Sequence, residues 1–310
     1  DIQAGESYRF SDMLPDSKPG QRAYIEAVGY TGADGHATIA VRPGAYTVYF
    51  SRGLEYDLGS VQVRVVEGGA ATASGQVNRV VDTSGWMSMD AHVHSENSID
   101  SHMALSDRVL SAAGEGVEIA ISTDHNFVSD WRPMLDAQSL RPWMRSFVGI
   151  EFTTLESGHF NTYPLEYQVA PVTHGAFEWF GRPPSELFAG LRQLADHDSG
   201  TNIIVCNHPR DSQQGYFNQY GRSSITGEPL AQGTSKRLAG PNGPAFFDQV
   251  GQNLISYDCD ALELVNGKLG HELHSVRVPT DWPSACYQPL PPGFDPKKQV
   301  DPCNLNGKIL

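Results

Sequence analysis

The chain has 310 residues, of which 39% are hydrophobic and 19% charged, and its formal net charge at pH 7 is -14. No apolar run approaches the roughly 18 residues of a membrane span, and no basic stripe is available to displace counterions from a phosphate backbone. The composition therefore argues against a membrane span and against nucleic acid as a partner, and it favours a small-molecule substrate or bound cations. The sequence starts at Asp1 without an initiator Met or an apolar leader. This predicts a secreted or periplasmic bacterial protein whose signal peptide has been removed.

The N-terminal part of the chain is expected to form a small all-β domain over residues 1–84. Short alternating runs at 23–30, 36–41, 46–50 and 61–65 are separated by turns at Asp34-Gly35 and Pro43-Gly44. Such spacing predicts a β-sandwich. The arrangement of these turns with Tyr46 resembles the carboxypeptidase-regulatory or transthyretin-like modules found on exported bacterial enzymes, which implies a structural or positioning role.

From residue 85 onward, strands are expected to alternate with helices. Strands are predicted at 86–94, 117–121, 146–150, 202–206 and 260–265, and helices at 106–115 and 185–198. This order predicts an α/β domain over residues 85–278, followed by a Pro-rich tail at 279–310.

Polar residues that can bind metal follow successive strands of this second domain. They are His92 and His94, Asp124 and His125, Glu151, and His208. The carboxyl ends of the strands are where α/β proteins, and barrels above all, build their active sites. A catalytic or metal-binding centre is therefore favoured over ordinary core histidines.

Five short segments carry a resemblance to a known superfamily. They are DAHVHS at 90–95, STDHN at 122–126, GIE at 149–151, GHFN at 158–161 and NHP at 207–209. In this order they resemble the motifs of the PHP (polymerase and histidinol phosphatase) superfamily, and more closely its CehA/McbA-like branch of ester and carbamate hydrolases. The resemblance implies a distorted PHP-type β/α barrel that holds two or three divalent metal ions (Zn, Mn or Fe) at its mouth.

The resemblance also implies a metal ligand set. In that family the H-x-H pair and a glutamate hold one ion, which implies His92, His94 and Glu151 here. The same glutamate bridges to a second ion that two later histidines hold, which implies His159 and His208.

A third metal site and two further roles are expected near these ligands. In many family members an aspartate after H-x-H and the His of T-D-H hold a third ion, which implies Asp100 and His125. Asp100 lies one residue beyond the commonest spacing, and His102 is an alternative. Asp124 is expected to orient a ligand, and Arg210 to meet an oxyanion or to form a surface ion pair.

The chain departs from the family pattern near its C-terminal end. PHP chains carry a late D-x-H motif, and none follows Gly267. Either a missing segment or a second polypeptide completes the site, which we favour, or the site holds fewer ions. Among the four cysteines, Cys286 and Cys303 are expected to form a disulfide in the tail. Cys206 and Cys259 lie in apolar runs and are expected to be buried free thiols.

The sequence thus predicts a metal-dependent hydrolase in which a metal-bound hydroxide attacks a carboxylic ester, an amide or a carbamate. One alternative is a phosphoesterase of the PHP type, although few Lys or Arg residues lie near the motifs. Another is a non-catalytic protein that binds a carbohydrate or a partner and whose barrel has decayed. The sequence has no G-x-S-x-G elbow and no P-loop, which disfavours serine hydrolases and nucleotide switches.

Overall fold

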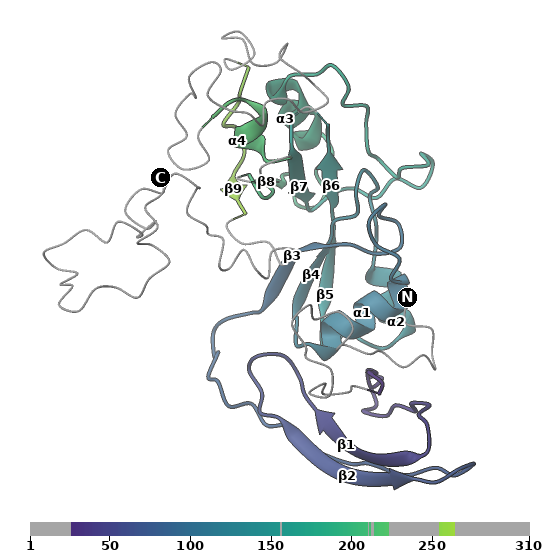
Figure 1. Ribbon diagram of the computed structural model, residues 1–310. Coiled ribbons are helices and arrows are strands. Elements are labelled where there is room, and N and C mark those ends of the chain that lie inside the picture. The colour runs from purple at the N-terminus through teal and green to yellow at the C-terminus, as the bar shows by residue number, and fades with distance from the viewer. Residues whose placement is uncertain (1–25, 156, 210, 212–213, 223–253, 264–310) are drawn as a thin grey trace, which may run out of the picture. The chain divides into compact units, whose positions relative to one another are not determined.

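The computed structural model describes residues 26–155, 157–209, 211, 214–222 and 254–263. The chain divides into two compact units, residues 1–149 and residues 150–310, and each is a mixed arrangement of short strands and helices (Figure 1). The predicted α/β class is confirmed at this level. No helix in the described part of the chain is long and apolar enough to cross a membrane.

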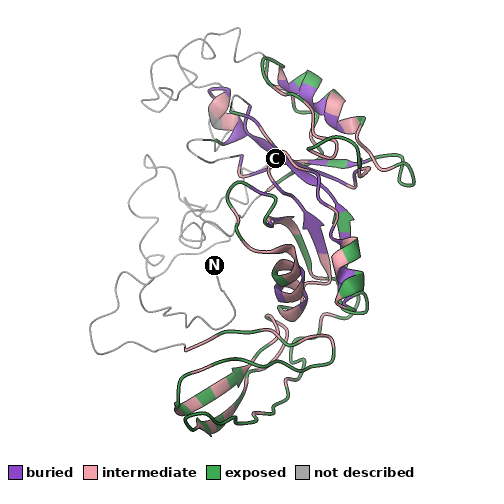
Figure 2. Cartoon of the chain, turned by 90° about the vertical axis from the view of Figure 1, so that its right-hand side faces the viewer, coloured by how far each residue is buried: buried purple, intermediate pink, exposed green. Residues whose placement is uncertain are grey.

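The first unit begins with an antiparallel hairpin. Strands β1 (Gly44–Phe50) and β2 (Gly59–Val65) pair along their whole length, and their residues alternate between half-buried and exposed (Figure 2). Both strands are confirmed from the sequence, because their apolar and polar residues alternate with the period of a strand that has one covered face.

A parallel three-stranded sheet forms the core of the first unit. Its strands are β3 (Met89–Val93), β4 (Ile119–Ser122) and β5 (Arg145–Val148), with β4 in the middle. Helix α1 (Leu105–Gly114) connects β3 to β4, and α2 (Arg132–Ala137) connects β4 to β5. The two helices and the loops around them bury apolar residues in one cluster: Val93, Val109, Ala113, Ala120, Trp131, Leu135, Leu140 and Met144.

The loop after β1 packs against the end of α1. Gly53 has a φ of +56°, and a Cβ there would lie 2.0 Å from the carbonyl oxygen of Glu115, so only glycine fits. The guanidinium of Arg52 lies 4.8 Å from the ring centroid of Trp143. The loop after β1 therefore contacts residues on both sides of β4.

The second unit is built on a four-stranded sheet. Strands β6 (Ile150–Thr153), β7 (His159–Tyr163) and β8 (Ile203–Cys206) pair antiparallel, and β9 (Ala261–Leu262) joins β8 in parallel. Helix α3 (Pro184–Arg192) precedes β8 and buries Leu187, Phe188 and Leu191, and the short α4 (Tyr216–Gln219) follows β8. The aromatic rings of Phe160, Phe188 and Tyr216 pack edge to face in this core.

Several predictions about the fold are not met. In the described residues 26–84 there is one two-stranded sheet where a sandwich was expected, and residues 26–30 and 36–41 are not strands. Residues 34–40 are all exposed, so the alternation of side chains there does not mark a covered face. The strand expected at 146–150 is two strands in different sheets, since β5 ends at Val148 and β6 begins at Ile150.

The predicted barrel and the predicted domain boundary both stay predictions. The described strands form three sheets and no closed barrel among them. The predicted boundary at residue 84 stays a prediction, whereas the division between the compact units falls at Gly149. The Pro-rich tail, Cys286 and Cys303 lie outside the described residues.

Candidate metal centre

The two histidines of the H-x-H motif lie at the end of β3: His92 is its penultimate residue, and His94 directly follows the strand. Val93 is tied to β4 through its backbone N–H, which donates to Thr123 Oγ1 at 2.7 Å, and through its carbonyl, which accepts from Thr123 N at 3.0 Å. The register of β3 with β4 shifts between Asp90 and Val93. Such a shift changes the direction of the side chains at that point of a strand. The rings of His92 and His94 lie 5.1 Å apart, edge to face. The expected neighbouring imidazoles are present.

His94, Asp100 and His125 form a first cluster of possible metal ligands within the first unit. Each offers one ligand atom, and these atoms lie within 4.8 Å of one another. His125 Nε2 is 3.5 Å from Asp100 Oδ2, and the rings of His94 and His125 stack at 4.7 Å. The structure therefore brings together the three residues, including Asp100 with its unusual spacing.

Ser98 contacts all three residues of the first cluster. The Ser98 hydroxyl donates to Asp100 Oδ1 at 2.9 Å and accepts from the backbone N–H of His125 at 3.2 Å. A hydroxyl has one proton to donate. With the hydroxyl proton assigned to Asp100, the 3.2 Å contact between Ser98 Oγ and His94 Nδ1 is assigned with the imidazole as donor. His94 consequently presents the lone pair of Nε2, the tautomer that a metal ligand on that nitrogen requires.

Asp124 holds the backbone beside the ligands. It is fully buried, and it accepts hydrogen bonds from Ser95 N at 2.5 Å, from Ser95 Oγ at 2.8 Å and from the hydroxyl of Ser129. Ser95 directly follows His94, and Asp124 directly precedes His125. Asp124 thus positions the chain that carries both histidines through its bonds to two serines, and its predicted role of orienting a metal ligand stays a prediction.

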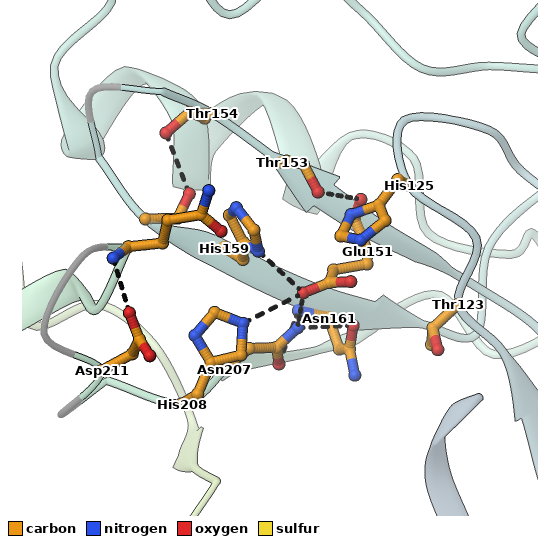
Figure 3. Close-up of polar contacts among 12 residues, drawn as sticks. Thr123, His125, Glu151, Thr153, Thr154, His159, Asn161, Asn207, His208 and Asp211 are labelled. Carbon is orange, nitrogen blue, oxygen red and sulfur yellow. Dashed lines mark hydrogen bonds and ion pairs between the residues drawn. The ribbon is translucent and has the colours of Figure 1, made fainter. Parts of the chain in front are cut away.

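Glu151, His159 and His208 form a second cluster within the second unit (Figure 3). Glu151 lies on β6, His159 opens the neighbouring β7, and His208 follows β8. The Glu151 side chain is 1% exposed, and its Oε1 lies 3.0 Å from His159 Nδ1 and 3.4 Å from His208 Nε2. The two imidazole rings meet edge to face at 4.9 Å. Three strands therefore deliver one buried carboxylate and two imidazoles to one place.

Asn207 holds this carboxylate, and Asn161 holds Asn207; both residues were named above only as parts of motifs. Asn207 Nδ2 donates to Glu151 Oε1 at 3.0 Å and to Asn161 Oδ1 at 2.7 Å. Asn207 Oδ1 accepts from the backbone N–H of Asn161 at 3.2 Å, which fixes the orientation of the amide. The signal for Asn161 was its place two residues after His159, on the same face of a strand.

The backbone of His208 is held in an unusual conformation. His208 has a φ of 27°, in the left-handed region that L residues seldom adopt. Its N–H donates to Glu263 Oε2 at 2.7 Å, and its carbonyl accepts from Asp211 N at 2.8 Å. Glu263 thus supports the backbone of a candidate ligand.

The two clusters have the chemistry of transition-metal sites. Imidazole nitrogens with carboxylate oxygens suit Zn, Mn and Fe alike, and the ligand atoms of the first cluster are close enough for one ion. The buried His/Glu group and the more exposed His/Asp group could hold metal ions. Of the remaining predicted site residues, His92 lies beside His94, and Arg210 lies outside the described residues.

A comparison with protein-family models found no match, and a comparison with curated proteins found no similar sequence.

Proposed function

We propose that the chain is a metal-dependent hydrolase of carboxylic esters, amides or carbamates, with the first and second clusters as its metal ligands. The observation that carries this proposal is Glu151, a fully buried carboxylate whose Oε1 is shared by His159, His208 and Asn207. Burying an ionised carboxylate costs desolvation free energy. Buried acids beside imidazoles therefore cluster at functional sites. The order of the motifs, which resembles that of PHP hydrolases with their β/α barrel, supports the same assignment.

His94, Asp100 and His125 would hold one divalent ion, and Glu151, His159 and His208 another, and such ions would supply a water acidified into the neutral pH range and polarisation of a carbonyl. The chain's own groups prepare the ligands for this task. Ser98 keeps the proton of His94 on Nδ1, and Asn207 holds Oε1 of Glu151 in place. Asp124 fixes the backbone on either side of the first cluster. Because these groups are buried, the ligands need little reorganisation when an ion binds.

The phosphoesterase and the non-catalytic binding protein remain the competing assignments. The full chain, reconstituted separately with Zn, Mn and Fe, is to be assayed with an aryl acetate, an aryl carbamate, an anilide and an aryl phosphodiester. The proposal expects turnover of at least one carboxylic or carbamic substrate and none without metal. Turnover of the phosphodiester alone would favour the phosphoesterase. A metal-loaded protein inert to the whole panel would reject the hydrolase.

A matched pair of histidine variants separates the site from the surface. His208→Asn removes a candidate ligand but keeps a residue that tolerates a positive φ. His197→Ala removes a histidine of the same unit that is 86% exposed and paired with Glu166 at 2.9 Å. The proposal expects His208→Asn to lose activity by at least about 100-fold, as for a lost ligand, and His197→Ala to keep it.

A further inference from the structure

Two thiols far apart in the sequence meet beside the second cluster. Cys206 is the last residue of β8 and is fully buried, and Cys259 lies just before β9 and is half-buried. Both are free cysteines, and the prediction of a buried thiol is confirmed for Cys206 but is wrong for Cys259. Their Sγ atoms lie 2.8 Å apart. A disulfide bond measures about 2.05 Å, so the two sulfur atoms need to approach by less than about 1 Å.

The backbone on both sides of this pair is firmly held. Asp260 N donates to the carbonyl of Ile204 at 2.8 Å, and Ile204 N donates to Asp260 Oδ2 at 2.7 Å. Arg192 binds the same carboxylate with two nitrogens, at 2.7 and 2.9 Å. Cys206 itself pairs with Leu262 in the β8–β9 ladder. The bonds between β8 and the segment at residues 260–262 thus hold the two thiols facing one another.

The same strand pair supports a candidate metal ligand. The carbonyl of Cys206 accepts from Glu263 N at 3.0 Å, and Glu263 Oε2 accepts from His208 N at 2.7 Å. Cys206 also directly precedes Asn207, which binds Glu151. A covalent link between β8 and the segment before β9 would tie down the residue that holds the backbone of His208.

We propose that Cys206 and Cys259 are a site of reversible disulfide formation, and that the bond locks β9 and Glu263 onto β8. The oxidant is a small-molecule disulfide. The thiolate of Cys259, the more accessible sulfur, attacks it and releases one small thiol. Cys206 then attacks Sγ of Cys259 in the mixed disulfide and releases the second. The two cysteines are oxidised, the reagent is reduced to two thiols, and the cysteine protons end on those thiols.

Peptide mapping tests the link without depending on metal or activity. The four cysteines fall on four different tryptic peptides, 193–210, 238–268, 278–297 and 299–308. The reduced full chain is incubated with oxidised glutathione, alkylated and digested without reductant. The proposal expects 193–210 joined to 238–268, and the separate peptides again after reduction. Peptides 193–210 and 238–268 that stay unlinked to each other would overturn it.

The stabilising effect is measured on the same samples. Oxidation is expected to raise the melting temperature by about 5 °C or more, because the bond closes a long loop. The rise should vanish in Cys206→Ser and in Cys259→Ser and persist in Cys286→Ser, whose thiol lies in another segment. A linked protein with an unchanged melting temperature would reject the locking role, and the mapping of the native chain stands even if a variant fails to fold.

Discussion

Asn207 donates a hydrogen bond of 3.0 Å to Glu151 Oε1, the same oxygen that both histidines of the second cluster approach. The bond joins the end of β8 to β6 across the intervening β7, with Asn161 of that strand holding the amide from its other side. The carboxylate is therefore held by an uncharged donor as well as by the two imidazoles.

We expect Asn207→Ala to weaken metal binding by about 10- to 100-fold, because outer partners of metal ligands typically contribute that much. The affinity for Zn is to be measured on the full chain by competition with a chelator. Asn78→Ala is the matched control, since it removes an exposed amide–carboxylate bond to Asp57 of 3.0 Å. Unchanged affinity in Asn207→Ala would show that Glu151 is oriented without this amide.

We expect Ser98→Ala to change the tautomer of His94. Without the hydroxyl, Nδ1 of His94 loses the acceptor for its proton, so the population of the Nε2-protonated form rises. The ¹⁵N chemical shifts of the histidine ring in the metal-free protein report this directly. Ser98→Thr should restore the native shifts, because threonine keeps the hydroxyl. Identical shifts in the native protein and Ser98→Ala would contradict the assignment.

We expect Asp124→Ala to lower the free energy of unfolding by about 2–4 kcal/mol. The variant leaves the N–H and hydroxyl of Ser95 and the hydroxyl of Ser129 without their buried acceptor. Urea denaturation measures the loss. Asp136→Ala, which removes an exposed carboxylate paired with Arg141, is the control and should cost far less. An equal loss of unfolding free energy in the two variants would show that Asp124 does not position this part of the chain.

The ion pair between Arg192 and Asp260 should make stability depend on pH. Hydrogen bonds from Arg192 lower the pKa of Asp260 below its ordinary value, and the backbone N–H of Ile204 adds to this effect. A carboxyl with a depressed pKa stabilises the fold above its unfolded pKa of about 3.9. That contribution is lost as the pH falls through the folded pKa.

Asp260→Asn therefore should melt below the native protein at pH 7, with the difference shrinking in acid. Melting temperatures of both proteins between about pH 3 and pH 7 provide the comparison. The effect should be modest, because 43% of the Asp260 side chain is exposed and solvent screens the pair. A difference that stays constant over the whole range would mean that the charge of Asp260 makes no contribution.

The sequence predicted the elements whose apolar period is clear and the polar residues at their ends. β1, β2, α1 and β8 lie where their patterns place them, within one or two residues. His94, His125 and His208 could be found because they follow the carboxyl ends of β3, β4 and β8, where α/β proteins build their sites. Glu151 was expected to follow a strand, but it is the second residue of β6, and His159 is the first residue of β7.

The features that the sequence did not predict depend mostly on which strands pair and in which register. The pattern of apolar and polar residues does not determine this. The run at 146–150 is continuously apolar apart from Ser146, so the separation of β5 from β6 at Gly149 has no signature in it. α2 has six residues, too few to show a helical period. The support that Asn207 and Glu263 give to the ligands depends on the register of β8 with β7 and β9.

The metal content of the purified full chain tests the central claim most directly. The protein and Glu151→Gln are dialysed together against buffer with Zn, Mn and Fe at micromolar concentration and then analysed by mass spectrometry of the elements. We expect about one to three ions per native chain and a clear loss in Glu151→Gln, with folding confirmed by circular dichroism. A folded native protein that retains no ion would contradict it.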